Sequence, residues 1–173
     1  MKKILLTYGI IAGLIVSVMM VLTFGIDIGL KGSELLGYTT MVVAFSTIFI
    51  AIRSYRNNYL GGSISFGKGF LLGLYITLIA SALYVISWMI LSETVAKDYM
   101  DNYFNEAVEQ IRQSSDLTQV EMDAKISEMD KFREMYKNPV VKIGMTFMEI
   151  FPVGLLITLI SAAILRRKET ANA

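Results

Sequence analysis

Residues 140–165 read VVKIGMTFMEIFPVGLLITLISAAIL, an apolar run interrupted by one lysine and one glutamate. Three further runs of similar composition occupy residues 4–24, 35–52 and 70–91. A helix of roughly 17 to 25 apolar residues is long enough to cross a hydrocarbon core about 30 Å thick. The four runs therefore predict an all-α membrane protein in which four transmembrane helices form a bundle, and we expect residues 1–173 to be a single membrane domain.

The composition excludes several classes of function. The chain contains no cysteine and no histidine, although 54% of its residues are hydrophobic. Disulfides, thiolate nucleophiles, histidine bases and the usual zinc sites are therefore excluded. We expect no catalytic residues, no metal and no other cofactor. A net charge of +1 also indicates no nucleic-acid partner.

Basic residues gather at alternate ends of the four runs. They are Lys2, Lys3, Arg53, Arg56, Lys68, Arg166, Arg167 and Lys168. Lysine and arginine in short flanks favour the cytoplasmic side of a membrane. We therefore expect a multi-pass protein of the bacterial cytoplasmic (inner) membrane, with both termini in the cytoplasm and residues 92–139 outside. Its partners would be the lipid bilayer and either another membrane protein or further copies of the chain.

The second connection offers candidate contacts to lipid phosphates, namely Arg53, Arg56 and Lys68. The spacing from Gly62 to Lys68 matches a phosphate-binding loop of nucleotide-binding proteins. However, Gly69 stands where the magnesium-binding serine or threonine is required, and no strand precedes the loop. We therefore expect lipid contacts here and no nucleotide site.

The segment 92–139 has the periodicity of two amphipathic helices. Turn residues at 114–116 separate them, and Thr118 and Glu121 have the spacing of a capping box. Asn138 and Pro139 predict a break before the fourth span. The hairpin either only covers the mouth of the bundle or also docks a partner. Its apolar residues are Val95, Tyr99, Tyr103, Phe104, Val108 and Ile111, then Met122, Ile126, Met129, Phe132, Met135 and Tyr136.

Glu149 lies inside the fourth apolar run, roughly 9 Å inward from Ile143 at the rise of an α-helix. A carboxyl group at that depth costs several kcal/mol unless it is protonated, paired or near water, so it is a candidate functional site. Pro152, three residues later, removes one helical hydrogen bond and favours a kink beside the acid.

Hydroxyl groups on neighbouring runs lie at a depth comparable to that of Glu149. Two alternatives follow. The polar layer either holds helices together, at about 1 kcal/mol per interhelical hydrogen bond, or it handles protons, ions or a substrate. The hydroxyl groups belong to Tyr38, Thr39, Thr40, Tyr84 and Ser87.

A short internal similarity relates the third and fourth runs. Residues 73–82 read GLYITLIASA and residues 154–163 read GLLITLISAA. The predicted topology sends these helices in opposite directions, as inverted repeats in transporters require. Ten residues of such limited composition also match by chance, so both interpretations stay open.

Five short segments are distinctive when taken together. They are Tyr8-Gly9-Ile10-Ile11-Ala12-Gly13, Leu36-Gly37-Tyr38, Arg53-Ser54-Tyr55-Arg56, Ile64-Ser65-Phe66-Gly67-Lys68 and Glu149-Ile150-Phe151-Pro152-Val153-Gly154. Through them the chain resembles the bacterial small membrane proteins grouped as domain of unknown function 4199. The resemblance covers nearly the whole chain and implies a multi-helix membrane protein, but it implies no activity, ligand or catalytic residue.

Three functions are compatible with these features. The first is a non-catalytic structural, interaction or regulatory component of the membrane. The second is a small transporter or proton-coupled permeation device that uses Glu149. The third, a membrane enzyme acting on lipids, is the weakest because no nucleophile with a base and no second intramembrane acid is visible.

Overall fold

The computed structural model describes residues 1–23 and 29–167 and confirms an all-helical fold. Its described part forms six helices: α1 (Lys2–Thr23), α2 (Gly29–Tyr59), α3 (Phe66–Glu93), α4 (Tyr99–Arg112), α5 (Gln119–Tyr136) and α6 (Pro139–Leu165). Four of them, α1, α2 from Gly32, α3 and α6, are long and apolar enough to cross a membrane. Residue 24, at the end of the first predicted span, lies outside the described residues, as does Lys168.

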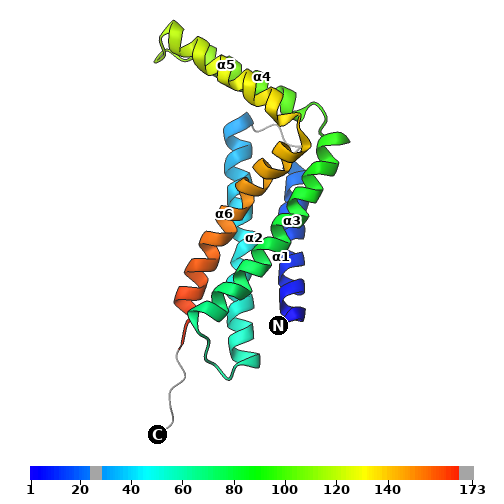
Figure 1. Cartoon of the computed structure of the whole chain (residues 1–173), viewed down its shortest axis with the longest axis vertical. Helices are drawn as coiled ribbons and strands as arrows, with labels where there is room; N and C mark the ends of the chain where they lie inside the picture. Colours follow the sequence, from blue (N-terminus) through cyan, green and yellow to red (C-terminus); the bar gives the residue numbers. More distant parts are fainter. Residues whose placement is uncertain (24–28, 168–173) are drawn as a thin grey trace.

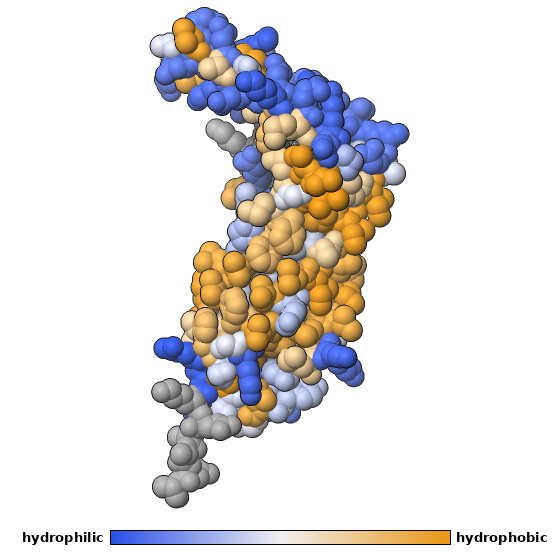
Figure 2. Space-filling model, viewed as in Figure 1, coloured by the Kyte–Doolittle hydropathy of each residue, from blue (hydrophilic) through white to orange (hydrophobic). Residues whose placement is uncertain are grey.

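The four long helices run alternately up and down as a bundle, and α4 and α5 form a hairpin across one end of it (Figure 1). The helix α3 packs against α1 and α6, and α2 packs against α1 and α6 as well. On the face that Figure 2 shows, apolar side chains form a broad band over the bundle, whereas the hairpin surface is mostly hydrophilic. We call the two ends of the molecule the hairpin end and the basic end.

The helices extend further than the apolar runs that predicted them. Instead of ending near residue 52, α2 continues to Tyr59, and α3 begins at Phe66 rather than at residue 70. Helical hydrogen bonds continue into polar sequence until a capping group replaces them. Here Ser65 caps α3, because its hydroxyl accepts a hydrogen bond from the Lys68 N–H at 3.3 Å.

The connection between α2 and α3 is held against the end of α6. Gly61 and Gly62 turn the chain with φ angles of +60° and +92°, which glycine adopts without a steric penalty. Ile64 and Arg167 then exchange two backbone hydrogen bonds, of 3.1 and 2.9 Å. This bridge ties the basic ends of α3 and α6 together.

The two similar segments of α3 and α6 pack against each other at equivalent positions. A Cβ atom at Gly73 would lie 2.6 Å from Thr158 Cγ2, and a Cβ at Gly154 would lie 2.5 Å from Thr77 Cγ2. Between the two glycines, the hydroxyl oxygens of Thr77 and Thr158 are 3.2 Å apart. The missing side chains allow the helices to approach closely, as small residues do in other membrane helices. The internal similarity therefore coincides with a reciprocal contact.

Most of the predicted signals of the hairpin are confirmed. Thr118 and Glu121 form the capping box of α5, and Asn138 accepts a hydrogen bond from the Val140 N–H at 2.9 Å to begin α6. Phe104, only 2% exposed, joins the facing helices through ring contacts. The prediction for Val95 is wrong, because this residue precedes α4 and is 75% exposed.

Candidate functional site

A cavity of about 450 Å³ lies under the hairpin, between the hairpin ends of the four long helices. All six described helices contribute to its wall. Its lining includes Thr23 of α1, Met145 of α6 and Phe132 of α5. The hairpin contributes residues from the start of α4 and from the end of α5, while its turn extends beyond the bundle (Figure 1).

Glu149 lines this cavity. Tyr84 donates a hydrogen bond to Glu149 Oε1 at 3.4 Å, a long contact from a side chain that is only 8% exposed. Glu149 itself is exposed. The carboxyl group is therefore not sealed among hydroxyl groups, and it is free to interact with whatever occupies the cavity.

Of the other predicted partners, the structure places Tyr38 and Thr40 on the same cavity wall. Thr39 is exposed and donates a hydrogen bond to the Leu35 carbonyl at 2.7 Å, so it does not line the cavity. Successive residues of a helix point about 100° apart, which separates Thr39 from its neighbours.

Ser87 and Pro152 also lie away from the cavity. Ser87 donates a hydrogen bond to Ser17 of α1 at 3.0 Å and joins those two helices. Pro152 is exposed within α6, which continues as one helix through this position. That any of the predicted residues acts in function stays a prediction.

The sequence analysis missed a second acid and most of the aromatic wall. Glu34 lines the cavity one turn before Tyr38 on α2, a spacing that puts both on one helix face. The hairpin contributes Tyr99, Tyr103, Phe132 and Tyr136, and α3 adds Trp88. The i, i+4 spacing of Tyr99 and Tyr103 was visible, but only the folded hairpin shows that this face turns toward the bundle.

The charges on the cavity wall have one sign. Two carboxyl groups, those of Glu34 and Glu149, line it, and no lysine or arginine does so in the part of the chain that the structure describes. Burial raises the pKa of the Tyr99 and Tyr136 hydroxyl groups above the ordinary tyrosine value. These hydroxyl groups therefore stay neutral and keep their protons for hydrogen bonding.

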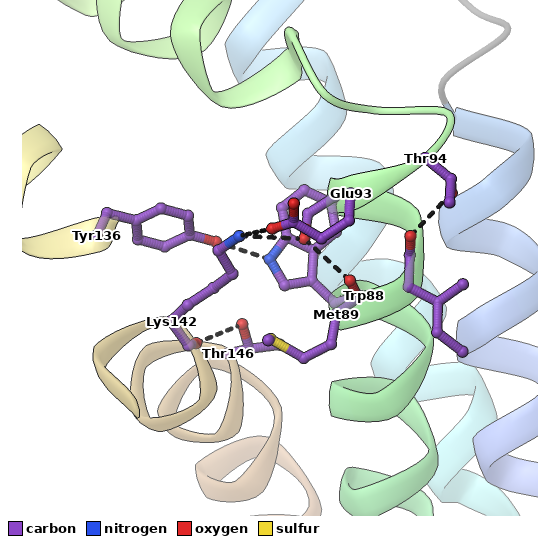
Figure 3. Close-up of polar contacts among 9 residues, drawn as sticks. Trp88, Met89, Glu93, Thr94, Tyr136, Lys142 and Thr146 are labelled. Carbon is purple, nitrogen blue, oxygen red and sulfur yellow. Dashed lines mark hydrogen bonds and ion pairs between the residues drawn. The ribbon is translucent and has the colours of Figure 1, made fainter. Parts of the chain in front are cut away.

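A polar network fastens the hairpin above the cavity (Figure 3). Trp88 Nε1 donates a hydrogen bond to the Tyr136 hydroxyl at 2.7 Å. Lys142 Nζ lies 2.8 Å from Glu93 Oε1 and 5.8 Å from the centre of the Tyr136 ring. These contacts connect α3, α5 and α6, so they hold the cover in place without adding a positive charge to the cavity wall.

No group of three or more acidic, histidine or cysteine side chains that could hold a metal ion is found within residues 1–23 and 29–167. Two carboxyl groups among aromatic rings are a poor match for the six to eight oxygen ligands of Ca²⁺. The cavity chemistry is that of an apolar site with a few polar groups.

At the basic end, the three candidate contacts to lipid phosphates have different surroundings. Lys68 lines a surface hollow together with Arg166 and Arg167. Arg56 Nη1 donates a hydrogen bond to the Leu165 carbonyl at 3.2 Å, and Arg53 is exposed outside that hollow. Their contact with lipid stays a prediction.

Comparison with known proteins identifies the family of the chain. No curated protein and no solved structure matches the chain. A family model matches residues 7–167, which include all four long helices and the hairpin almost entirely. The chain therefore belongs to the family described as Protein of unknown function (DUF4199).

Proposed function

We propose that this protein is a non-catalytic ligand-binding component of the bacterial cytoplasmic membrane, with a binding site in the hairpin-covered cavity. The observation that carries the proposal is the position of Glu149 on the wall of that cavity. A volume of about 450 Å³ lies within the range of small-molecule sites, which are mostly apolar with a few polar groups. In a membrane span without a cavity, a carboxyl group would cost free energy through burial and would have no ligand to contact.

The packing of the bundle below the cavity favours binding over open permeation. Phe45, Ile48 and Ile76 are fully buried there, and the close contact of α3 with α6 fills the same region. The cavity therefore reaches into the bundle from the hairpin end only. In the proposed orientation, with both termini in the cytoplasm, the ligand arrives from the extracytoplasmic side or the outer leaflet.

A small proton-coupled transporter is the second candidate. The reciprocal contact of the two similar segments, at Gly73 with Thr158 and at Gly154 with Thr77, supports it. Inverted repeats let transporters expose one central site to either side of the membrane. A binding component needs no such exchange, so the two candidates differ in whether ligand crosses the membrane.

Accessibility of single cysteines tests the proposed site, because the chain has no cysteine of its own. Gly37 lines the cavity, and a Cβ there meets no atom within 4 Å. Met148 is 65% exposed but does not line the cavity, so Met148→Cys is the control at the membrane surface of the bundle. In intact cells, we expect a hydrophilic, membrane-impermeant maleimide to label Gly37→Cys and to leave Met148→Cys unlabelled, since thiolates form in water.

Two further variants fix the orientation in the same experiment. Ser115→Cys in the turn of the hairpin should be labelled from outside, and Asn57→Cys at the basic end should be labelled only after the cells are opened. Labelled Ser115→Cys together with unreactive Gly37→Cys would contradict an accessible cavity. Labelling of Asn57→Cys in intact cells would contradict the orientation.

A further inference from the structure

The charge of the cavity wall points to a cationic ligand. Glu34 and Glu149 line the cavity from α2 and α6, with no basic side chain among the described wall residues. Lys142 of α6, which does not line the cavity, is paired with Glu93 at 2.8 Å. A carboxylate in such surroundings is stabilised by a positive charge, because the low dielectric strengthens their attraction. A bound cation would supply the charge partner that the described wall residues lack.

The aromatic side chains of the wall narrow the class of cation. The π face of tyrosine, tryptophan and phenylalanine attracts a cation within about 6 Å of the ring centre, and aromatic cages use this attraction to hold quaternary ammonium groups. The rings of Trp88 and Tyr99 meet edge to face, with their centres 5.9 Å apart, and form a corner of the wall. The other aromatic side chains of the wall are Tyr38, Tyr84, Tyr103, Phe132 and Tyr136.

Lys142 shows the same chemistry at the edge of the site. Its ammonium group lies 5.8 Å from the centre of the Tyr136 ring, whose hydroxyl accepts a hydrogen bond from Trp88. One aromatic side chain of the wall thus already carries a cation near its ring.

Five methionines add apolar and adaptable parts to the wall. They are Met19, Met20, Met41, Met100 and Met145. Their unbranched thioether side chains fit irregular apolar shapes and contact aromatic groups favourably. A hard metal ion such as Ca²⁺ prefers oxygen ligands and would gain nothing from thioethers, whereas the hydrocarbon part of an organic cation would be buried among them.

We infer that the cavity binds an amphiphilic organic ammonium ion, with the charged group between Glu149, Glu34 and the aromatic rings and the apolar part against the methionines. This inference rests on the proposed function, since it names the ligand class of the same cavity. It requires that charge, and not only hydrophobicity, decides which molecules bind.

Three molecules of nearly equal shape separate charge from hydrophobicity: benzyltrimethylammonium, its uncharged carbon analogue neopentylbenzene and the anion benzylsulfonate. Trp88 is the only tryptophan of the chain and lines the cavity, so its fluorescence reports occupancy. With the full chain in lipid nanodiscs, we expect the cation to change the Trp88 fluorescence in a saturable way. The uncharged analogue should bind at least about tenfold more weakly than the cation, and the anion should not bind.

Matched variants assign the effect to the wall. Glu149→Gln should weaken binding of the cation by about tenfold or more while changing that of neopentylbenzene little, because only the charge is removed. Glu128→Gln, on an exposed hairpin residue outside the cavity, should leave both unchanged. If Glu149→Gln does not fold, Tyr103→Leu serves instead, with a several-fold loss for the cation expected from the missing ring.

The outcomes separate the two proposals. Equal binding of the cation and neopentylbenzene, or no binding of the cation, would overturn the inference of an ammonium ligand. If the inference fails in this way but Gly37→Cys is labelled, the proposed ligand-binding function is still supported. A cysteine at Gly37 that no reagent reaches would remove the proposed function itself.

Discussion

The contact between α3 and α6 can be tested by adding one methyl group. In Gly73→Ala, the new Cβ would lie 2.6 Å from Thr158 Cγ2, 2.9 Å from Thr158 Oγ1 and 3.0 Å from Ile48 Cγ2. These distances are shorter than normal van der Waals contacts, and Thr158 and Ile48 are both fully buried. The added methyl group therefore fits only if the two helices move apart.

The expected cost follows from two opposing effects. Overpacking a filled core costs about 1–3 kcal/mol, while alanine is about 1 kcal/mol better than glycine in a helix. We expect Gly73→Ala to lower the free energy of unfolding by up to about 2 kcal/mol. Gly144→Ala on α6 is the matched control, because a Cβ there meets no atom within 4 Å. It should be neutral or stabilise the protein by up to about 1 kcal/mol.

Reversible unfolding of the purified protein in mixed micelles, followed by Trp88 fluorescence, measures both variants. The double variant Gly73→Ala/Thr158→Ala tests the cause. Thr158→Ala alone should lower the free energy of unfolding by about 0.6 kcal/mol, because it removes the hydroxyl contact with Thr77. In the double variant the same change also makes room for the new methyl group at position 73. We expect a coupling energy of about 1 kcal/mol in favour of the double variant. Strict additivity, or equal stability of the Gly73 and Gly144 variants, would refute the close contact.

Two predictions concern the hairpin. The capping hydrogen bonds lower the pKa of Glu121 below its ordinary value, so their stabilisation is complete above the unfolded pKa and is lost as the pH falls through the folded pKa. Amide exchange protection at the start of α5 should decrease at acidic pH and lose this dependence in Glu121→Gln; an unchanged profile in that variant would exclude the cap. Lys142→Met removes the pair with Glu93 and should destabilise the hairpin by about 1 kcal/mol or less, seen as a red shift of Trp88 emission. Lys137→Met, which removes a more exposed pair, should leave the emission unchanged, and equal shifts in both variants would contradict the anchoring role.

Local sequence signals predicted the elements of the fold well. Helix formation in apolar runs, the capping box at Thr118 and the break at Pro139 depend on residues that are neighbours in the chain. The depth of Glu149 in the membrane follows from the helical rise alone. The helical rise also places Tyr84, which donates a hydrogen bond to Glu149, at about the same depth. Such features need no knowledge of how the helices are rotated.

Helix rotation decided which of the predicted hydroxyl groups meet the acid. Thr40 faces the cavity and Thr39 does not, although they are adjacent, and Ser87 turns toward α1 instead. Apolar residues surround each span almost evenly, so the sequence pattern does not show which face of the helix is buried. The rotation of each helix about its axis is therefore decided by its contacts with the other helices.

By itself the sequence determined four membrane-type helices, a capped helical hairpin and one deeply placed acid. Only the tertiary structure decided that the base of the hairpin lies over the bundle and completes a cavity lined by Glu34, Glu149 and aromatic rings. The physical reason is that a cavity is formed by contacts between segments far apart in the chain. The polar network of Trp88, Tyr136 and Lys142 that holds the cover down is one such set of contacts.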